Sequence, residues 1–320
     1  MKKLLSISLA IVLLISTIIA LPSCNKENQK YTVGICQYVQ HPALDEATRG
    51  FKQALIDKLG QDKVDFIEQN AAEDTNACTT IVQSFVSKNV DLIMANATPA
   101  LAAAYNATNT IPILGTSVTE YGTALGIKDF NGTVGGNVSG TSDLASLNEQ
   151  AQMIIDLFPN ATKVGILYCS AEDNSKYQVD QVEKYLTEKN ITVTKYPFSD
   201  NNDIAAITTT CADNNDVIYI PTDNKAASCA ETIGNIVIQK KIPVVAGEEG
   251  ICKSCGVTTL SISYYDLGYK TGEMAAKILT GESKIGEMPI EYAPATKKYN
   301  KTICDAIGMT IPEGYEKIGD

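Results

Sequence analysis

The sequence has a single histidine and none of the short motifs that mark the common enzyme classes. It contains no G-x-S-x-G, no phosphate-binding P-loop and no G-x-G-x-x-G. His41 precedes a proline and is interpreted as a loop or helix-cap residue, because one histidine builds no triad or metal cluster without partners. We therefore expect no catalytic residue, no metal and no cofactor. The enzyme alternative that is left is glycoside hydrolysis by Asp223 with Glu248, but the sequence does not specify the separation of these two carboxylates.

Basic residues are scarce, and so are long apolar runs. The chain has 26 Lys and Arg against 37 Asp and Glu. Without the two lysines at its start, 24 basic side chains face 37 acidic ones, a net charge of −13. Nucleic-acid binding requires clustered Lys and Arg, so this class is excluded. After residue 24 no stretch is long and apolar enough to span a membrane, so the remainder is expected to be soluble.

The first 24 residues have the pattern of an export signal. Lys2 and Lys3 precede an apolar run that stops at Leu21-Pro22-Ser23-Cys24. Cysteine after Ser23 resembles a bacterial lipobox, from which Pro22 departs. We expect residues 1–23 to be a signal peptide, Cys24 to be lipidated, and residues 24–30 to be a polar tether to the membrane. The alternative is an uncleaved spanning helix, which the length of the run allows.

Nine cysteines are many for a chain of this length. Most of those after Cys24 lie in apolar or small-residue runs and are interpreted as small core residues. Only Cys252-x-x-Cys255 has the spacing of a metal or redox motif. A bare turn or a local disulfide is favoured over zinc, which needs two further ligands at suitable spacing.

Apolar strands alternate with helices, which predicts βαβ units on parallel sheets. Expected strands are 31–36, 64–67, 91–95, 111–114, 217–220 and 257–262, and expected helices include 43–59, 75–88, 100–107, 176–189 and 266–279. The pattern occurs twice. Val33-Gly34-Ile35 recurs 131 residues later as Val164-Gly165-Ile166, and Ile111-Pro112 recurs as Ile242-Pro243 at the same offset. The repeat predicts two similarly folded lobes, each a candidate domain.

The repeat also brings polar strand-end loops into correspondence. Pro221-Thr222-Asp223-Asn224 follows an apolar strand and opens a helix, and Thr98 holds a similar place in the first block. Superposing the blocks puts Ser117 where Glu248 lies. Hydroxyls and helix N–H groups of the first lobe suit a carboxylate, and the acidic side chains of the second suit an ammonium group. Together they predict a site for an amino acid, unless Asp223 only caps its helix and Glu248 is solvated.

Tyrosines offer flat surfaces beside these loops. Tyr38 and Tyr168 follow the first strand of each block, Tyr121 follows the Ser117 loop, and such rings suit an aromatic or apolar ligand. Asn174 is a polar candidate that a helix cap explains equally well. The complete set of predicted ligand-binding residues is Gln37, Tyr38, Asn96, Thr98, Thr116, Ser117, Thr141, Ser142, Tyr168, Asn174, Thr222, Asp223, Asn224 and Glu248.

Several of these segments resemble one known family. His41-Pro42-Ala43-Leu44-Asp45, Ala97-Thr98-Pro99-Ala100, Pro221-Thr222-Asp223-Asn224, Gly247-Glu248-Glu249 and Tyr264-Tyr265-Asp266-Leu267-Gly268 are similar to segments of the ABC-transporter substrate-binding lipoproteins that include tryptophan-binding proteins. The resemblance spans about residues 31–312. The cysteines, notably Cys36 and Cys252-x-x-Cys255, depart from that family's pattern.

The resemblance implies a type I periplasmic-binding-protein fold, an α/β structure of two Rossmann-like parallel-sheet lobes joined by a three-strand hinge. It implies an N-terminal lobe of residues 31–140 plus 258–283 and a C-terminal lobe of residues 141–257 plus 284–320. It also implies an amino-acid ligand (Trp, Tyr or Phe) bound by hinge closure, and an ABC permease with its ATPase as partners of a monomeric, extracytoplasmic, lipid-anchored protein. The alternative is a receptor that presents an amino acid, nucleoside or sugar to a membrane sensor, which the sequence does not distinguish.

Overall fold

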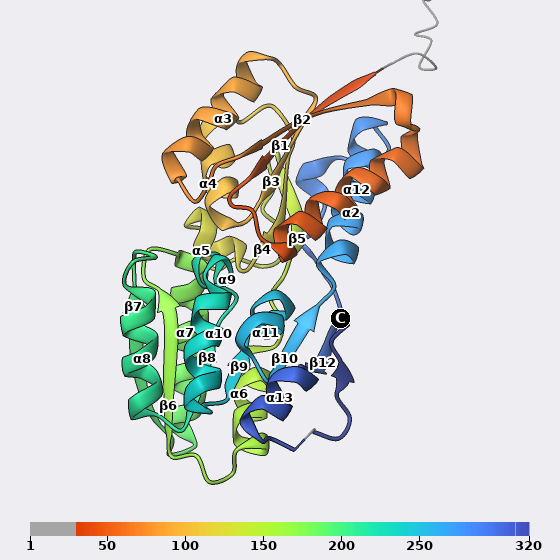
Figure 1. Cartoon of the computed structure of the whole chain (residues 1–320). Coiled ribbons are helices and arrows are strands. Elements are labelled where there is room, and N and C mark those ends of the chain that lie inside the picture. Colours follow the sequence, from red (N-terminus) through yellow and green to blue (C-terminus); the bar gives the residue numbers. More distant parts are fainter. Residues whose placement is uncertain (1–29, 311, 320) are drawn as a thin grey trace, which may run out of the picture. The chain divides into compact units, whose positions relative to one another are not determined.

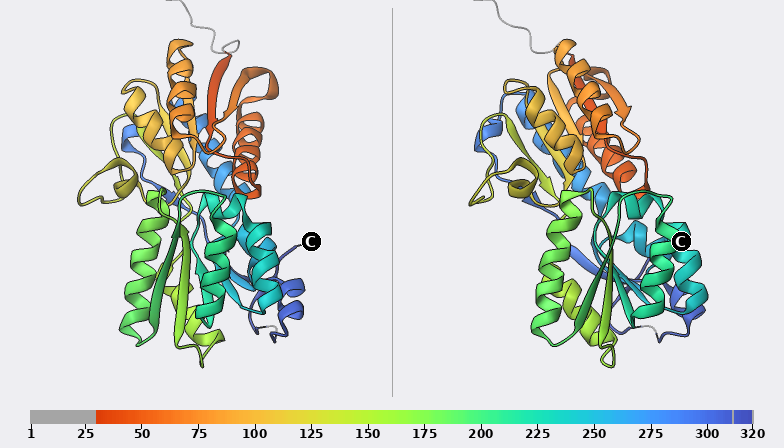
Figure 2. Two further views of the ribbon diagram at one scale, coloured as in Figure 1. Left: turned by 60° about the vertical axis from the view of Figure 1, so that its left-hand side comes forward. Right: turned by 90° about the vertical axis from the view of Figure 1, so that its left-hand side faces the viewer.

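The computed structural model describes residues 30–310 and 312–319. The expected signal peptide and the lipidation site at Cys24 lie outside the described residues. Residues 31–310 and 312–319 belong to one compact unit. It contains two sheets, each with helices packed on both faces (Figures 1 and 2).

Within the described residues, the first sheet is entirely parallel and has the strand order β11-β5-β4-β3-β1-β2. Its strands are β1 (Tyr31–Gln37), β2 (Val64–Asn70), β3 (Leu92–Asn96), β4 (Ile113–Val118), β5 (Val138–Ser142) and β11 (Glu291–Tyr292). β3 and β4 are buried at every position, because helices cover both faces of the sheet.

The second sheet has the order β13-β12-β10-β9-β8-β6-β7 and is parallel except for the pair β10–β12. Its strands are β6 (Lys163–Cys169), β7 (Thr192–Phe198), β8 (Val217–Ile220), β9 (Val244–Ala246), β10 (Thr258–Ile262), β12 (Ala295–Tyr299) and β13 (Glu316–Lys317). The order β10-β9-β8-β6-β7 reproduces β5-β4-β3-β1-β2 of the first sheet. The structure therefore confirms the repeat, and Val33 and Val164 pair at equivalent places, with Leu92 and Val217.

The helices lie close to their expected positions. In the first lobe they are α2 (Pro42–Leu59), α3 (Thr75–Ser87), α4 (Thr98–Ala107), α5 (Tyr121–Leu125) and α12 (Tyr264–Leu279). In the second lobe they are α6 (Leu147–Leu157), α7 (Asp173–Glu188), α8 (Ile204–Asn214), α9 (Asn224–Ser228), α10 (Ala230–Lys240), α11 (Glu249–Cys255) and α13 (Lys301–Ile307). None of the described helices is long and apolar enough to span a membrane.

Helices α2 and α12 pack directly against each other on one face of the first sheet. A Cβ on Gly268 would lie 1.9 Å from the carbonyl oxygen of Ala47, and a Cβ on Gly50 would lie 2.1 Å from that of Tyr265. Only glycine permits so close an approach of the two backbones. This packing holds α12, which comes late in the sequence, against α2, which comes early in it.

The chain passes between the lobes three times: after β5, between β10 and α12, and between β11 and β12. The strand pairing differs from the expected lobe limits, because each crossing strand pairs in the lobe that it leaves. β10, expected in the N-terminal lobe, pairs in the second sheet, and β11, expected in the C-terminal lobe, pairs in the first. Residues 141 and 142 also pair in the first sheet, as the end of β5. The other lobe limits stay a prediction.

The described cysteines are free thiols. Cys36, Cys78, Cys169, Cys211 and Cys304 are buried, as expected of core residues. Cys252 and Cys255 occupy neither a bare turn nor a disulfide, so that prediction was wrong. They lie one turn apart on α11, and both pack into the core of the second lobe.

Candidate functional site

The carboxyl ends of the central strands of both sheets point toward the interface between the lobes (Figure 1). Two side-chain contacts join the loops across this interface. Lys225 Nζ of α9 lies 2.8 Å from Glu73 Oε2, which follows β2. His41 Nε2, just before α2, lies 3.4 Å from Asn224 Oδ1. As expected, His41 occupies the N-cap position of α2, but its ring reaches the other lobe.

Asp223 lies in the loop after β8, at the N-cap position of α9, and is almost completely buried. One carboxylate oxygen accepts from the Ala226 N–H at 2.8 Å, which caps α9, and the other accepts from the Cys169 N–H at 2.6 Å. Burial raises the pKa of this carboxyl. The helix-capping interpretation of Asp223 is therefore correct, and its contact with a ligand ammonium stays a prediction.

Glu248 caps α11 by accepting from the backbone N–H groups of Gly250, at 2.6 Å, and of Ile251. Its side chain is buried rather than solvated. Burial raises its pKa to about 7, although the two N–H groups favour the charged form. A nearby cation would recover the ionised state, so Glu248 is electrostatically suited to an ammonium group.

Glu172, which the sequence analysis missed, organises the second lobe's side of the interface. Its carboxylate accepts from the backbone N–H groups of Asn224 (3.1 Å) and Lys225 (2.9 Å), and from the side-chain amides of Asn224 (2.7 Å) and Asn174 (3.0 Å). Burial, and then the neighbouring charge of Asp223, raises its pKa to about 7. No sequence motif marks Glu172, because Asn224 and Lys225, which supply three of its four hydrogen bonds, are more than fifty residues away.

Asp143 and Tyr264 are a buried, hydrogen-bonded pair that the sequence analysis also missed. Tyr264 Oη donates to Asp143 Oδ2 at 2.9 Å, and Thr119 Oγ1 donates to Asp143 Oδ1 at 3.1 Å. Burial raises the pKa of Asp143 to about 6 despite these bonds. Glu248 is close enough for the charge of Asp143 to raise its pKa further. The interface therefore holds several desolvated carboxyl groups.

Three of the predicted ligand-binding residues have a buried side-chain oxygen without a hydrogen-bond partner. These atoms are Ser117 Oγ, Asn96 Oδ1 and Asn174 Oδ1. Asn96 and Ser117 lie at the adjoining ends of β3 and β4, and Asn174 lies in the first turn of α7. Ser117 has a φ of 54°, which is unusual for a residue other than glycine. Buried polar atoms are normally paired, so these unpartnered atoms indicate places for ligand groups. The amide oxygens of Asn96 and Asn174 can accept from a donor, and the Ser117 hydroxyl can accept or donate.

Four other predicted residues have their side chains bonded within the first lobe. Gln37 binds Val39, Asp45 and Thr48. The hydroxyls of Thr116 and Thr141 lie 3.3 Å apart, and both contact the hydroxyl of Thr271 on α12. Ser142 donates to the Thr119 carbonyl at 2.8 Å. These contacts tie α12 and the first crossing to the sheet.

The remaining candidates lie in or beside the loops at the interface. Thr98 opens α4 and is buried, Tyr38 donates to the Glu73 carbonyl at 3.0 Å, and Tyr168 is half-buried at the end of β6. The Thr222 hydroxyl lies 3.3 Å from the carbonyl oxygen of Gly247. Tyr121 is not at a cleft edge, because its ring is buried in the first lobe and its hydroxyl donates to the Thr141 carbonyl.

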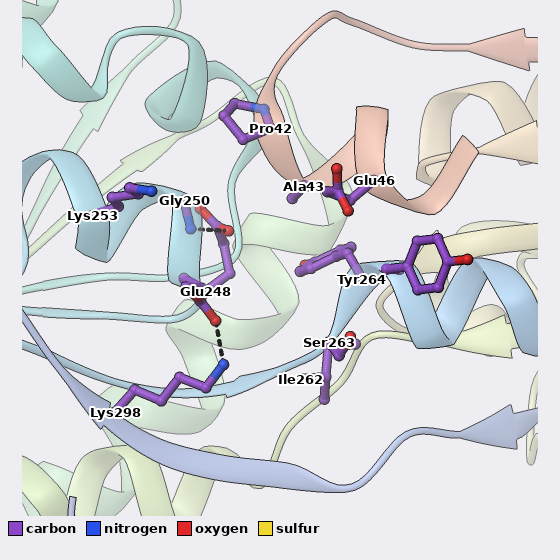
Figure 3. Close-up of a pocket in the computed structure, with 12 residues that line it drawn as sticks. Pro42, Ala43, Glu46, Glu248, Gly250, Lys253, Ile262, Ser263, Tyr264 and Lys298 are labelled. Atoms are coloured by element: carbon purple, nitrogen blue, oxygen red, sulfur yellow. Dashed lines mark hydrogen bonds and ion pairs between the residues drawn. The ribbon is translucent and has the colours of Figure 1, made fainter. Parts of the chain in front are cut away.

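A cavity of about 430 Å³ opens between α2 and α12 of the first lobe and α11 and β12 of the second. Figure 3 shows the ring of Tyr264 extending from α12 toward Glu248 and α11. Lys298, paired with Glu249, lines another side. Of the predicted residues, Glu248 lines this cavity. No group of three or more metal-ligating side chains occurs within residues 30–310 and 312–319.

Comparison with known proteins identifies the family. The family model for "ABC transporter substrate binding protein" matches residues 32–318. The chain belongs to this family. It is also 38% identical, over 92% of its length and 89% of the relative's, to a protein from Clostridioides difficile named "Tyrosine-binding protein".

Solved structures agree with this assignment. A Streptococcus pneumoniae domain in complex with L-Trp has a TM-score of 0.85 at 29% identity, covering 91% of this chain and all of that one. A ligand-free, open substrate-binding protein with adhesive properties from Clostridium difficile has a TM-score of 0.70 at 36% identity, covering 90% and 99%. These matches confirm the type I periplasmic-binding-protein fold, in which two parallel-sheet lobes are joined by three crossings.

Family membership confirms that the chain is a binding protein rather than an enzyme. Substrate-binding proteins of ABC transporters bind a small solute outside the cytoplasm, which agrees with the expected class of ligand and location.

Proposed function

We propose that this protein is the lipid-anchored solute-binding component of an ABC importer and binds an aromatic amino acid between its lobes. The observation that carries the proposal is the set of buried, unpartnered oxygens of Asn96, Ser117 and Asn174, at an interface that also holds desolvated carboxyl groups. Unpartnered hydroxyls and amides need ligand atoms, and crowded carboxyls need positive charge. The carboxylate of an amino acid can accept from the Ser117 hydroxyl, and its ammonium can donate to the amide oxygens and to the carboxyl groups.

The roles follow from the chemistry of each side. In the first lobe, Ser117 Oγ, Thr98 and the N-terminal N–H groups of α4 hold the carboxylate, since a helix N-terminus favours negative charge. In the second lobe, Glu248 and Asp223 hold the ammonium, and each keeps its capping bonds because a carboxylate accepts more than two hydrogen bonds. Tyr38 and Tyr168 contact the ligand's ring.

The names of the relatives support an aromatic ligand. One is called tyrosine-binding, and another was solved with L-Trp. The Trp complex superposes better than the open ligand-free structure although it is less identical in sequence. The higher TM-score with the ligand complex supports a closed arrangement of the lobes, which agrees with the interlobe contacts of Lys225 and His41.

The remainder of the proposal rests on the first thirty residues and on the family. Cys24 carries the lipid, and residues 24–30 form the tether. The partners are a permease and its ATPase, and the binding protein is monomeric.

Titration calorimetry of the purified protein against the twenty amino acids, nucleosides and sugars tests the ligand. We expect heat with L-Tyr, L-Trp or L-Phe and none with sugars. Binding of a sugar without binding of any aromatic amino acid would refute the ligand assignment and leave the family assignment intact.

A further inference from the structure

Two adjacent residues of α9 and two side chains of the first lobe make direct contact across the interface. We call these four residues the interlobe latch: His41, Glu73, Asn224 and Lys225. The Lys225–Glu73 pair is well shielded, with 16% and 14% of the two side chains exposed. Most other ion pairs of the described residues are more exposed and join groups within one lobe, such as Lys195 with Glu183.

The first-lobe side of the latch is held in an unusual backbone conformation. Ala72 and Glu73 both have positive φ, 51° and 66°. Tyr38 fixes this loop at two points: its carbonyl accepts from the Glu73 N–H, and its hydroxyl donates to the Glu73 carbonyl, each at 3.0 Å. Asn70 Oδ1 accepts from the Ala72 N–H at 2.7 Å. Two successive left-handed residues other than glycine are costly, so the loop is maintained by these bonds and presents Glu73 toward the second lobe.

The second-lobe side is fixed by Glu172. Its carboxylate binds the backbone N–H groups of both Asn224 and Lys225, and the side-chain amide of Asn224. The Asn224 amide nitrogen is thereby turned toward Glu172, which leaves its oxygen facing His41. Each half of the latch is therefore positioned by hydrogen bonds within its own lobe.

We propose that the interlobe latch sets the equilibrium between open and closed lobes, with Glu172 as its positioning residue. Neither Glu73 nor Lys225 is assigned a contact with the ligand. The pair therefore contributes to the lifetime of the closed state rather than to ligand recognition. Closing desolvates an ion pair whose partners are already oriented, and a shielded pair of this kind mainly slows separation. For its ligand, this inference rests on the proposed function.

The test is a double-mutant cycle on the dissociation rate of L-Tyr or L-Trp, measured by stopped flow. Glu73→Gln and Lys225→Met should each raise the dissociation rate about tenfold with a small effect on association. The double variant should be no faster than about tenfold, because both changes remove the same interaction. Glu183→Gln, which removes an ion pair within the second lobe, is the matched control and should behave as the wild type.

Small-angle X-ray scattering of the ligand-free protein gives a readout that does not depend on the ligand. Glu73→Gln keeps the size of its side chain and should increase the radius of gyration relative to the wild type and Glu183→Gln. If none of L-Tyr, L-Trp and L-Phe binds the wild type, the proposed aromatic ligand is refuted, and scattering still tests the latch. Unchanged scattering together with wild-type dissociation rates would overturn the inference. An increase of about a hundredfold in the dissociation rate of the double variant would also overturn it, because the two residues would then act independently.

Discussion

The hydroxyl of Tyr264 donates a hydrogen bond of 2.9 Å to the carboxylate of Asp143, and the two residues lie on different crossings between the lobes. Asp143 follows β5, and Tyr264 begins α12 directly after β10. A buried, charge-assisted bond thus joins two of the three connections about which the lobes move. The hinge is braced by side chains as well as by the backbone.

Tyr264→Phe should weaken this brace. We expect a loss of about 1–3 kcal/mol in the free energy of unfolding at pH 8, where Asp143 is ionised, and a smaller loss at pH 5. The pKa of Asp143 should rise above about 6, because the hydrogen bond from Tyr264 lowers it in the native protein. Urea denaturation at both pH values measures the effect. Tyr265→Phe, at the neighbouring half-exposed position, is the control and should change stability little.

The buried carboxyls predict that the ligand-free protein loses stability as pH rises from 5 to 8. The folded-state pKa values of Asp143, Glu172 and Glu248 are raised to about 6, 7 and 7. A carboxyl group with a raised pKa stabilises the fold fully below its unfolded-state pKa, here 3.8 to 4.5. This stabilisation is lost as the pH rises through the folded-state pKa. Each such group contributes about 1–2 kcal/mol. Burial lowers the pKa of His41, which opposes the trend below pH 6.5.

These carboxyls, together with Asp223, whose pKa burial also raises, outnumber the one histidine, so a net loss on the order of 3 kcal/mol is expected between these pH values. Denaturation midpoints with a constant urea dependence measure it. In Glu248→Gln the pH dependence should be smaller. A stability that rises steadily to pH 8 would contradict the prediction.

Ser117→Ala tests the carboxylate site. If Ser117 Oγ binds the ligand, affinity should fall about tenfold, while the ligand-free protein should be as stable as the wild type, because the hydroxyl has no partner to lose. Calorimetry and thermal denaturation give the two readouts. Thr208→Val removes another buried, unpartnered hydroxyl, in α8 of the second lobe, and should leave affinity unchanged. Equal affinities for both variants would exclude Ser117 from the site.

Asp223→Asn separates capping from ligand binding. The amide keeps one acceptor oxygen for two backbone N–H groups, so stability should fall by about 1–3 kcal/mol without ligand. Contact with the ammonium would add an affinity loss of about tenfold. Asp216→Asn is the matched control, since Asp216 also accepts two backbone N–H groups, at the opposite ends of the strands. Unchanged affinity in Asp223→Asn would leave Asp223 a purely structural cap.

Local patterns predicted most of the fold. Strand β8 appears in the structure with its expected limits, and α2 begins at Pro42, where proline fits a first helical turn. The offset of 131 residues predicted the two equivalent sheets, since repeated apolar spacing gives repeated packing. The sheet pairing of β10 and β11 differs from the predicted lobe limits, because an apolar pattern shows that a strand is buried but not which of two sheets it joins.

The sequence by itself determined which residues stand at the ends of buried strands, among them Asn96, Ser117, Asp223 and Glu248. Only the tertiary structure decided which of their atoms are already used. The bonds of Thr116 and Thr141 to Thr271, and of Asp143 to Tyr264, join residues more than a hundred positions apart. Such contacts depend on how crossing strands bring distant side chains together, and no local spacing encodes them. For the same reason Glu172, without a motif, emerged as the organiser of one side of the interface.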